Sequence, residues 1–274
     1  MASEKVGIIA SLWRYPVKSM MGEVLLSTDI TEKGILGDRS YALIDKETGK
    51  IVSAKNPKLW PDMFAFRSRY TQSPMTGNGL STAAITLPDG SVVTTDQANA
   101  NVTLSSALGR EVEIISQVPN DPQLEEYWPD MEELDHRDIV TDENMPAGTF
   151  YDLAIVHLLT RSTLEKLASI YPEGEFEVRR FRPNIVVNTE SDQADFIENE
   201  WIGKTIAIGN NVRLKITEPC PRCVMTTLPQ GNLPRDVGIL RAAAQNNDAH
   251  VGVYTEVIHT GTVHCDDAVI LEND

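Results

Sequence analysis

The stretch Glu218-Pro219-Cys220-Pro221-Arg222-Cys223-Val224-Met225-Thr226-Thr227 places two of the chain's three cysteines close together, with an arginine between them. A thiolate beside a fixed cation can bind a soft metal or a reactive sulfur, and can hold anionic groups nearby. The apolar run at residues 212–217 predicts a strand immediately before this stretch. The two cysteines are therefore expected where a strand ends.

Three kinds of site are compatible with Cys220 and Cys223. A structural zinc site needs four ligands, but Cys265 and the five histidines supply no second metal-binding pair. A thioredoxin-like redox pair opens a helix inside a βαβ unit, whereas β-branched residues follow this motif. The third is a single metal-bound thiolate in a loop between strands, with positive groups around it.

Basic residues stand at the ends of several other predicted strands, which is notable in an acidic protein. They are Lys18 with Ser19, Arg39, and the run Arg179-Arg180-Phe181-Arg182-Pro183-Asn184. Each alone is typical of a surface salt bridge. Together with Arg222 they could line a pocket for a phosphorylated, anionic cofactor.

The composition is that of a globular protein, and it excludes some partners. The chain has 274 residues, of which 41% are hydrophobic, and its 24 basic and 40 acidic residues give a net charge of −16. This charge disfavours nucleic acid and anionic membranes as partners. Residues 1–5 show no secretory leader, and no apolar run approaches the roughly 18 residues of a membrane span. With only three cysteines, we expect a cytoplasmic protein.

More than half of the net negative charge is concentrated between residues 120 and 144, where ten acidic residues stand against Arg137 alone. This segment predicts a solvated linker or surface loop. Alternatively, it forms a docking face for a basic redox partner. We take residues 119–146 as the linker between a domain at 1–118 and a domain at 147–274.

Short strands dominate both halves of the chain. Strands are predicted at 6–14, 40–45, 67–71, 83–87, 91–95 and 112–115, and then at 154–159, 184–188, 205–208, 212–217, 251–257 and 267–271. Helices are expected from Asp96 to Gly109, after Thr160 or Ser162, and at 235–245. The pattern indicates a mainly β fold with a few helices, arranged as two β-barrel-like halves.

Five motifs follow one another over nearly the whole chain: Leu12-Trp13-Arg14-Tyr15-Pro16-Val17-Lys18-Ser19, Gly37-Asp38-Arg39, Phe181-Arg182-Pro183-Asn184-Ile185, Pro219-Cys220-Pro221-Arg222-Cys223 with Thr226-Thr227, and Val251-Gly252-Val253-Tyr254. With these motifs in this order, the chain resembles the MOSC-domain proteins that carry a MOSC N-terminal β-barrel domain. That family includes the mitochondrial amidoxime-reducing component and its bacterial relatives. The resemblance implies an N-terminal β-barrel-like domain at 1–118 and a MOSC β-barrel domain at 147–274. It also implies binding of the molybdenum cofactor, which consists of molybdenum and molybdopterin.

The resemblance assigns roles residue by residue. Cys223 would be the catalytic thiolate ligand of molybdenum. The cofactor-binding residues would be Lys18, Ser19, Arg39, Arg182, Asn184, Arg222 and Tyr254. Cys220 would shape the loop, Cys265 would be a turn residue, and His157 would be a hydrogen-bonded core histidine.

The implied function is a molybdenum-dependent oxidoreductase that reduces small N-hydroxylated compounds. The three cysteines do not have the spacing of a plant-type iron–sulfur cluster. Electrons would then come from a separate protein, such as a ferredoxin-like protein or a flavoprotein. The alternative is a cofactor carrier or sulfur-transfer module, related to the C-terminal domains of cofactor sulfurases. The family's association with pyridoxal phosphate belongs to the large domain of those sulfurases, which the sequence does not contain.

Overall fold

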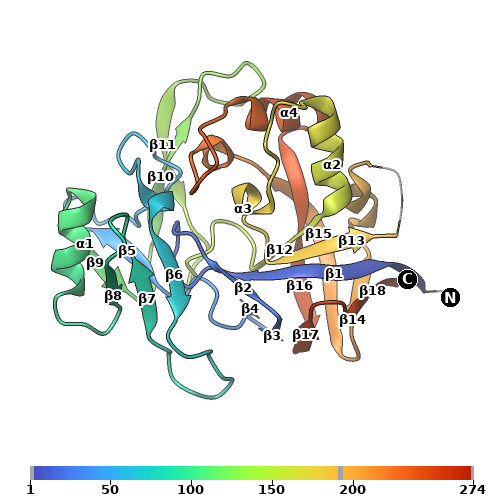
Figure 1. Cartoon of the computed structure of the whole chain (residues 1–274), viewed down its shortest axis with the longest axis horizontal. Helices are drawn as coiled ribbons and strands as arrows, with labels where there is room; N and C mark the ends of the chain where they lie inside the picture. Colours follow the sequence, from blue (N-terminus) through green and yellow to red (C-terminus); the bar gives the residue numbers. More distant parts are fainter. Residues whose placement is uncertain (1–2, 191–193, 273–274) are drawn as a thin grey trace.

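Two β-rich halves make up the computed structural model, which describes residues 3–190 and 194–272 (Figure 1). Of residues 1–5, which show no secretory leader in the sequence, Met1 and Ala2 lie outside the described residues. The expected fold class is confirmed, since most elements are short strands and the described residues form four α-helices. None of these helices is long and apolar enough to cross a membrane.

A closed barrel occupies the C-terminal half. Seven of the described strands follow the order β13-β12-β16-β15-β14-β18-β1, and β1 pairs back with β13 to close the ring. Their bounds are β1 Glu4–Arg14, β12 Val156–Thr160, β13 Ile185–Thr189, β14 Thr205–Ile208, β15 Val212–Pro221, β16 His250–His259 and β18 Ala268–Glu272. Alternate residues of β15, such as Val212 and Leu214, are fully buried inside, and burying each such side chain contributes roughly 1.5–3 kcal/mol.

The first strand of the chain belongs to this C-terminal barrel. In β1, Leu12 pairs with Ile185 of β13, while Ile8 pairs with both β13 and Ala268 of β18. Ile9 and Leu12 are completely buried among the barrel residues. The barrel therefore draws a strand from the region expected to be the N-terminal domain. The domain bounds 1–118 and 147–274 stay a prediction.

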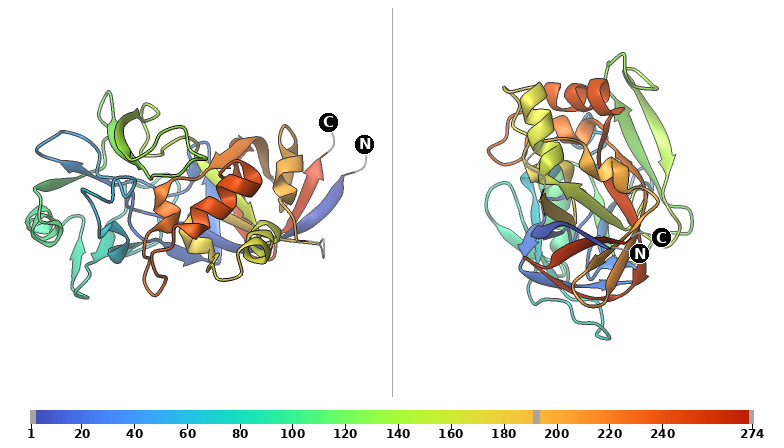
Figure 2. Two further views of the ribbon diagram at one scale, coloured as in Figure 1. Left: turned by 90° about the horizontal axis from the view of Figure 1, so that it is seen from above. Right: turned by 90° about the vertical axis from the view of Figure 1, so that its right-hand side faces the viewer.

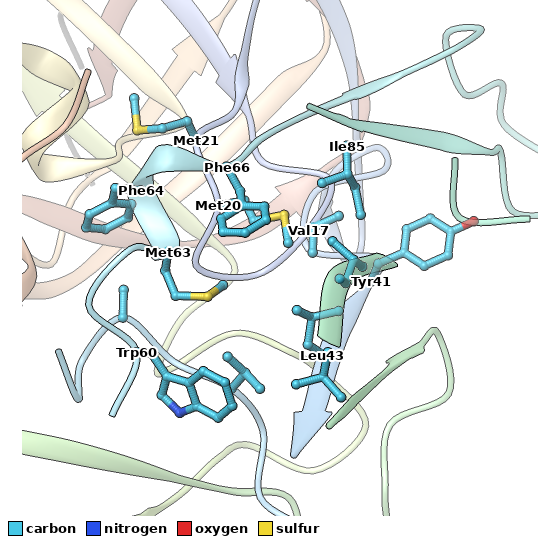
Figure 3. Packing of buried hydrophobic residues seen from close by; sticks show 14 of the residues in the cluster. Val17, Met20, Met21, Tyr41, Leu43, Trp60, Met63, Phe64, Phe66 and Ile85 are labelled. Atoms are coloured by element: carbon cyan, nitrogen blue, oxygen red, sulfur yellow. The ribbon is translucent and has the colours of Figure 1, made fainter. Parts of the chain in front are cut away.

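The N-terminal half consists of short sheets around its own core. The elements in this part of the chain are β2 Glu23–Leu25, β3 Ser27–Thr31, β4 Gly34–Ile35, β5 Ala42–Asp45, β6 Arg67–Tyr70, β7 Ala83–Thr86, β8 Val92–Thr94, α1 Ala100–Leu108 and β9 Val112–Ile115. Of these, β2 pairs with β1, and β3 pairs with β17 (Gly261–His264), so these first strands pack on the barrel. Figure 3 shows part of this core, with Met20 beside Phe66 and with Trp60 farther away in the same cluster, below Met63. Val224 and Leu228 from the cysteine loop are buried in the same cluster. The two halves thus share the packing of the loop that carries Cys223.

The acidic segment contains a β-hairpin, so it is not the irregular solvated loop that its composition suggested. Its role as a linker between two domains stays a prediction. β10 (Gln123–Trp128) pairs with β11 (Ile139–Asn144) in antiparallel register. Leu124 is buried against Ala42 and Phe150. Lysines of the N-terminal half supply counter-charges, as Lys50 pairs with both Glu125 and Asp142. Apolar anchors and paired charges therefore order a segment whose composition suggests a solvated coil.

The helices α2 (Arg161–Ile170) and α4 (Gly238–Asn247) pack beside the barrel, whereas α1 packs in the N-terminal core. These three follow the predictions with shifted ends, and the short α3 (Val178–Phe181) was not predicted. The 3₁₀ turns are Met63–Ala65, Ile197–Trp201 and Val224–Thr227. Thr160 caps α2, since its hydroxyl accepts a hydrogen bond from the Thr163 backbone N–H at 3.2 Å. The first helix begins at Ala100 rather than after Asp96, and Gly109 ends it in the left-handed conformation, as predicted.

Candidate functional site

A cavity of about 600 Å³ opens where the barrel, the acidic hairpin and the N-terminal half meet. Six of the eight residues expected at a site line this cavity. They are Arg39, Arg182, Asn184, Arg222, Cys223 and Tyr254. Figure 2 shows from two further directions how the hairpin lies beside the helices of the C-terminal half. The structure thus brings together residues that are more than two hundred positions apart in the chain, such as Arg39 and Tyr254.

Cys223 lies between the end of β15 and the 3₁₀ turn Val224–Thr227, and it is half-buried at the cavity wall. Its backbone is extended, and its carbonyl accepts hydrogen bonds from the Thr226 N–H at 3.2 Å and the Thr226 hydroxyl at 3.1 Å. On one side, the Arg222 N–H donates to the Ala249 carbonyl at 2.8 Å. On the other, Val224 is buried in the N-terminal core. The thiol is therefore held by backbone contacts on both sides.

Cys220 has a different position. Its side chain is fully buried, and the Arg222 guanidinium donates a hydrogen bond to its sulfur. The same guanidinium donates to the Phe181 carbonyl at 2.7 Å. Cys220 thus lies behind the cavity wall, in agreement with the prediction that it shapes the loop. Cys265 is remote, in the turn between β17 and β18, as predicted.

Arg39 and Arg182 form a cationic wall around the ring of Tyr15. Their guanidinium carbons lie 4.7 Å and 4.2 Å from the centre of that ring, and both residues have left-handed backbones, with φ of 43° and 53°. Burial lowers the pKa of Arg182 to about 10, with a further contribution from Arg39. Burial also acts to lower the pKa of Arg39, but the Asp38 carboxylate outweighs it and raises that pKa. Both arginines therefore remain cations at neutral pH.

Lys18 and Ser19 lie behind the cavity rather than on its surface. The Lys18 ammonium is buried, donates to the Phe150 carbonyl at 2.9 Å and pairs with Asp152. The Ser19 hydroxyl accepts a hydrogen bond from the Ala54 N–H at 3.0 Å. The polar groups of both side chains are bonded to other groups of the protein, so a role toward a cofactor would be indirect.

Asp152 is the cavity residue that the sequence analysis missed. Its carboxylate lies between the ammonium groups of Lys18 and Lys55, the second at 3.9 Å. Burial acts to raise its pKa, but the two lysines outweigh burial and hold the pKa well below its usual value. Asp152 follows no recognisable strand end in the sequence, so only the fold shows that it faces the cavity.

Asn184, His157 and Tyr254 complete the barrel side of the cavity. The Asn184 side-chain amide donates a hydrogen bond to the Asp38 carboxylate at 3.0 Å, and its oxygen accepts one from the backbone N–H of His157 at 3.1 Å. The His157 ring bonds the Val251 carbonyl at 3.1 Å, which confirms the expected hydrogen-bonded core histidine. The Tyr254 ring meets it edge-on at 5.9 Å. Position 252 must be glycine for the His157 ring to fit, because a Cβ there would lie 2.3 Å from His157 Nε2.

The Cys223 thiol has a raised pKa of about 11, because it is buried and because the Glu126 carboxylate lies nearby; Lys55 opposes this shift. In metal-free protein we therefore expect iodoacetamide to alkylate Cys223 at pH 8 on the order of a hundredfold more slowly than free cysteine. Since only the thiolate reacts, the rate should rise about tenfold per pH unit through pH 9.5. Peptide mass spectrometry of quenched samples measures it.

The matched control for this prediction is Glu126→Gln. Removing that carboxylate removes a cause of the raised pKa and frees Lys55, its ion-pair partner at 2.9 Å. Alkylation at pH 8 should then become faster. A wild-type rate that levels off below pH 9 would show that the thiol is not held protonated.

The donor set at Cys223 limits what metal chemistry the site can support. Among the described residues, no group of three or more His, Cys, Asp or Glu side chains is arranged to hold a metal ion. A metal ligated by Cys223 would therefore take most of its ligands from a group that it brings with it. A cofactor with its own sulfur ligands and an anionic tail fits this thiol and the cations around it.

Comparisons with known proteins agree with the two-part architecture. Residues 6–116 match the MOSC N-terminal beta barrel domain, and residues 148–270 match the MOSC domain. The chain is 27% identical over 237 residues to mitochondrial amidoxime reducing component 2 of Macaca fascicularis, covering 82% of this chain and 68% of that protein. It is also 27% identical over 243 residues to mitochondrial amidoxime-reducing component 1 of Homo sapiens, covering 82% and 67%.

Among solved structures, the YUAD protein of Bacillus subtilis aligns over 100% of this chain and 98% of its own, with 11% sequence identity and a TM-score of 0.47.

Proposed function

From the premise that this chain is a MOSC-domain protein with a MOSC N-terminal β-barrel domain, we propose that it binds the molybdenum cofactor and reduces N-hydroxylated compounds. The observation that supports this most directly is the Cys223 thiol on the wall of a cavity of about 600 Å³, which among the described residues is lined by this one cysteine and by four arginines. The names of the related proteins, which describe amidoxime reduction, support the reaction type.

The cavity suits the cofactor in size and charge. Pockets for cofactors typically enclose about 300–1,000 Å³, and this one encloses about 600 Å³. Arg39, Arg182 and Arg222 offer planar donors for a phosphate, and Cys223 offers the soft ligand that a thiophilic metal prefers. When bound, the cofactor supplies two-electron redox chemistry and an acceptor for the oxygen of an N–OH group.

The protein's own residues would position this chemistry. Cys223 would ligate the metal as a thiolate, so binding would release the proton that the raised pKa otherwise retains. Asp152, fixed between Lys18 and Lys55, places a permanent carboxylate beside the bound group. Tyr254 and Asn184 would fix the barrel side of the pocket. We propose a small-molecule substrate, and electrons from a separate ferredoxin-like protein or flavoprotein. The cytoplasmic location stays a prediction, and the named relatives are mitochondrial.

The test is the molybdenum and pterin content of the protein from a cofactor-producing host, followed by turnover of benzamidoxime with a chemical reductant. About one molybdenum per chain together with turnover supports the proposal. Bound cofactor without turnover, but with transfer to a cofactor-free enzyme, would favour the carrier alternative. Protein free of both molybdenum and pterin would overturn the cofactor assignment.

A further inference from the structure

The charges of the acidic hairpin divide into two sets according to the direction they face. Carboxylates turned toward the N-terminal half are paired: Glu126 with Lys55 at 2.9 Å and Asp138 with Lys58 at 3.0 Å, in addition to the two on Lys50. Glu133, Asp135 and Glu143 line the cavity together with the paired Glu126. Among the described residues these three form no salt bridge, and the cations that act on Glu133 are Arg241 and Arg137. We call these three carboxylates the acidic rim.

The loop that carries most of the rim reaches across to the helices of the barrel half. Glu133 accepts a hydrogen bond from the Gln245 side-chain amide of α4 at 2.6 Å, and Leu134 lines the cavity beside Ala244 of the same helix. Figure 1 shows the tip of the β10–β11 hairpin near α4. Glu133 is thus anchored to the barrel half as well as to the hairpin, and the Glu143 carboxylate accepts a hydrogen bond from the Thr141 hydroxyl of its own strand at 2.6 Å.

The cavity therefore has walls of opposite charge. Arg39, Arg182 and Arg222 form the cationic wall, and the rim faces it from the hairpin. An anionic cofactor against the arginines would neutralise much of their charge. The field left for an incoming small molecule would then be dominated by the unpaired carboxylates, because charged walls around a poorly hydrated cleft concentrate ions of opposite sign.

We propose that the acidic rim makes the site selective for positively charged N-hydroxylated substrates over anionic ones of the same shape. This inference rests on the proposed reductase function and names the substrate class within it. A basic protein partner is the competing explanation for the rim's charge. The structure favours the small cation, since all three carboxylates line the same cavity as the cationic wall. Glu133 and Asp135 are also exposed to solvent, so the experiment tests the partner explanation directly.

The test uses three substrates that differ only in charge: benzamidoxime and its para-trimethylammonium and para-carboxylate derivatives. Each is reduced by cofactor-loaded protein with one chemical reductant, and kcat/KM is normalised to molybdenum content. In wild type we expect the cationic derivative to be preferred over the anionic one by about tenfold or more at low salt. This preference should shrink as ionic strength rises, because the Debye length falls to about 8 Å near 0.15 M salt.

The variant is the triple substitution Glu133→Gln, Asp135→Asn, Glu143→Gln, which keeps shape and removes three charges. Its control removes the same number of charges from exposed acidic residues that do not line the cavity: Glu111→Gln, Asp121→Asn, Glu32→Gln. The rim variant should lose most of the cation-over-anion preference. The control should keep it, which separates a local effect from a change in net charge.

The outcomes separate a failure of the proposed reductase function from a failure of the proposed role of the acidic rim. If wild type does not reduce benzamidoxime at all, the proposed function fails before the rim is tested. If benzamidoxime is reduced but the charge preference is absent, or is the same in the rim variant, the rim inference is wrong. If the rim variant loses turnover only with a basic protein donor, with no change for the small substrates, the rim is a partner-docking surface instead.

Discussion

Cys223→Ala protein should lose both molybdenum and turnover, retaining less than about one hundredth of wild-type activity. Loss of residues that merely support a metal ligand typically costs about 10–100-fold, so loss of the ligand itself should cost at least the upper end of that range. Among the described residues, Cys223 is the one cysteine that lines the cavity, so no second thiol can replace it. Metal analysis, pterin fluorescence and benzamidoxime turnover on the same preparation measure the loss.

The matched control is Cys265→Ala, which removes a thiol from the turn between β17 and β18. It should keep cofactor content and activity near wild type. Circular dichroism should show that both variants are folded, because Cys223 is only half-buried and its backbone bonds do not need the thiol. Full cofactor content in Cys223→Ala would mean that the thiol is not the ligand.

Local patterns made much of the barrel predictable from the sequence. Strands such as 205–208 alternate or run apolar, and β14 occupies those residues in the structure. The Pro88-Asp89-Gly90 pattern likewise predicted a turn. In the structure Gly90 has a positive φ, which glycine adopts without strain. Arg39, Arg182 and Cys223 each stand beside a strand end in the sequence, and the fold brings all three to one cavity; their roles at that cavity stay predictions.

Contacts between distant parts of the chain were not predictable in the same way. Nothing local to β1 shows that it pairs with β13, more than 170 residues later. The acidic hairpin was missed because Lys50, Lys55 and Lys58, which neutralise it, lie in another part of the sequence. Asp152 was missed for the same reason, as its lysine partners identify it only once the chain is folded. The charge composition alone suggested that these carboxylates are solvated, whereas in the fold lysines pair with them.

Arg180→Ala should be the most destabilising single change near the site. The Arg180 side chain is almost fully buried and donates to four backbone carbonyls: Glu175 at 2.9 Å, Thr226 at 3.2 Å, Leu228 at 3.2 Å and Pro234 at 2.9 Å. Alanine would leave these carbonyls without their donor and open a cavity, which together should cost about 3–5 kcal/mol of unfolding free energy. Urea unfolding monitored by tryptophan fluorescence measures this difference.

Its neighbour Arg179 provides the control. Arg179 is partly exposed and contacts Glu177 and Asn232, so Arg179→Ala should cost less than about 1 kcal/mol. Arg180 also fixes Thr226, whose N–H binds the Cys223 carbonyl, so residual folded Arg180→Ala should bind the cofactor poorly. Equal stabilities for the two variants would show that the loop after Cys223 is held by Val224 and Leu228 in the N-terminal core rather than by the buried guanidinium.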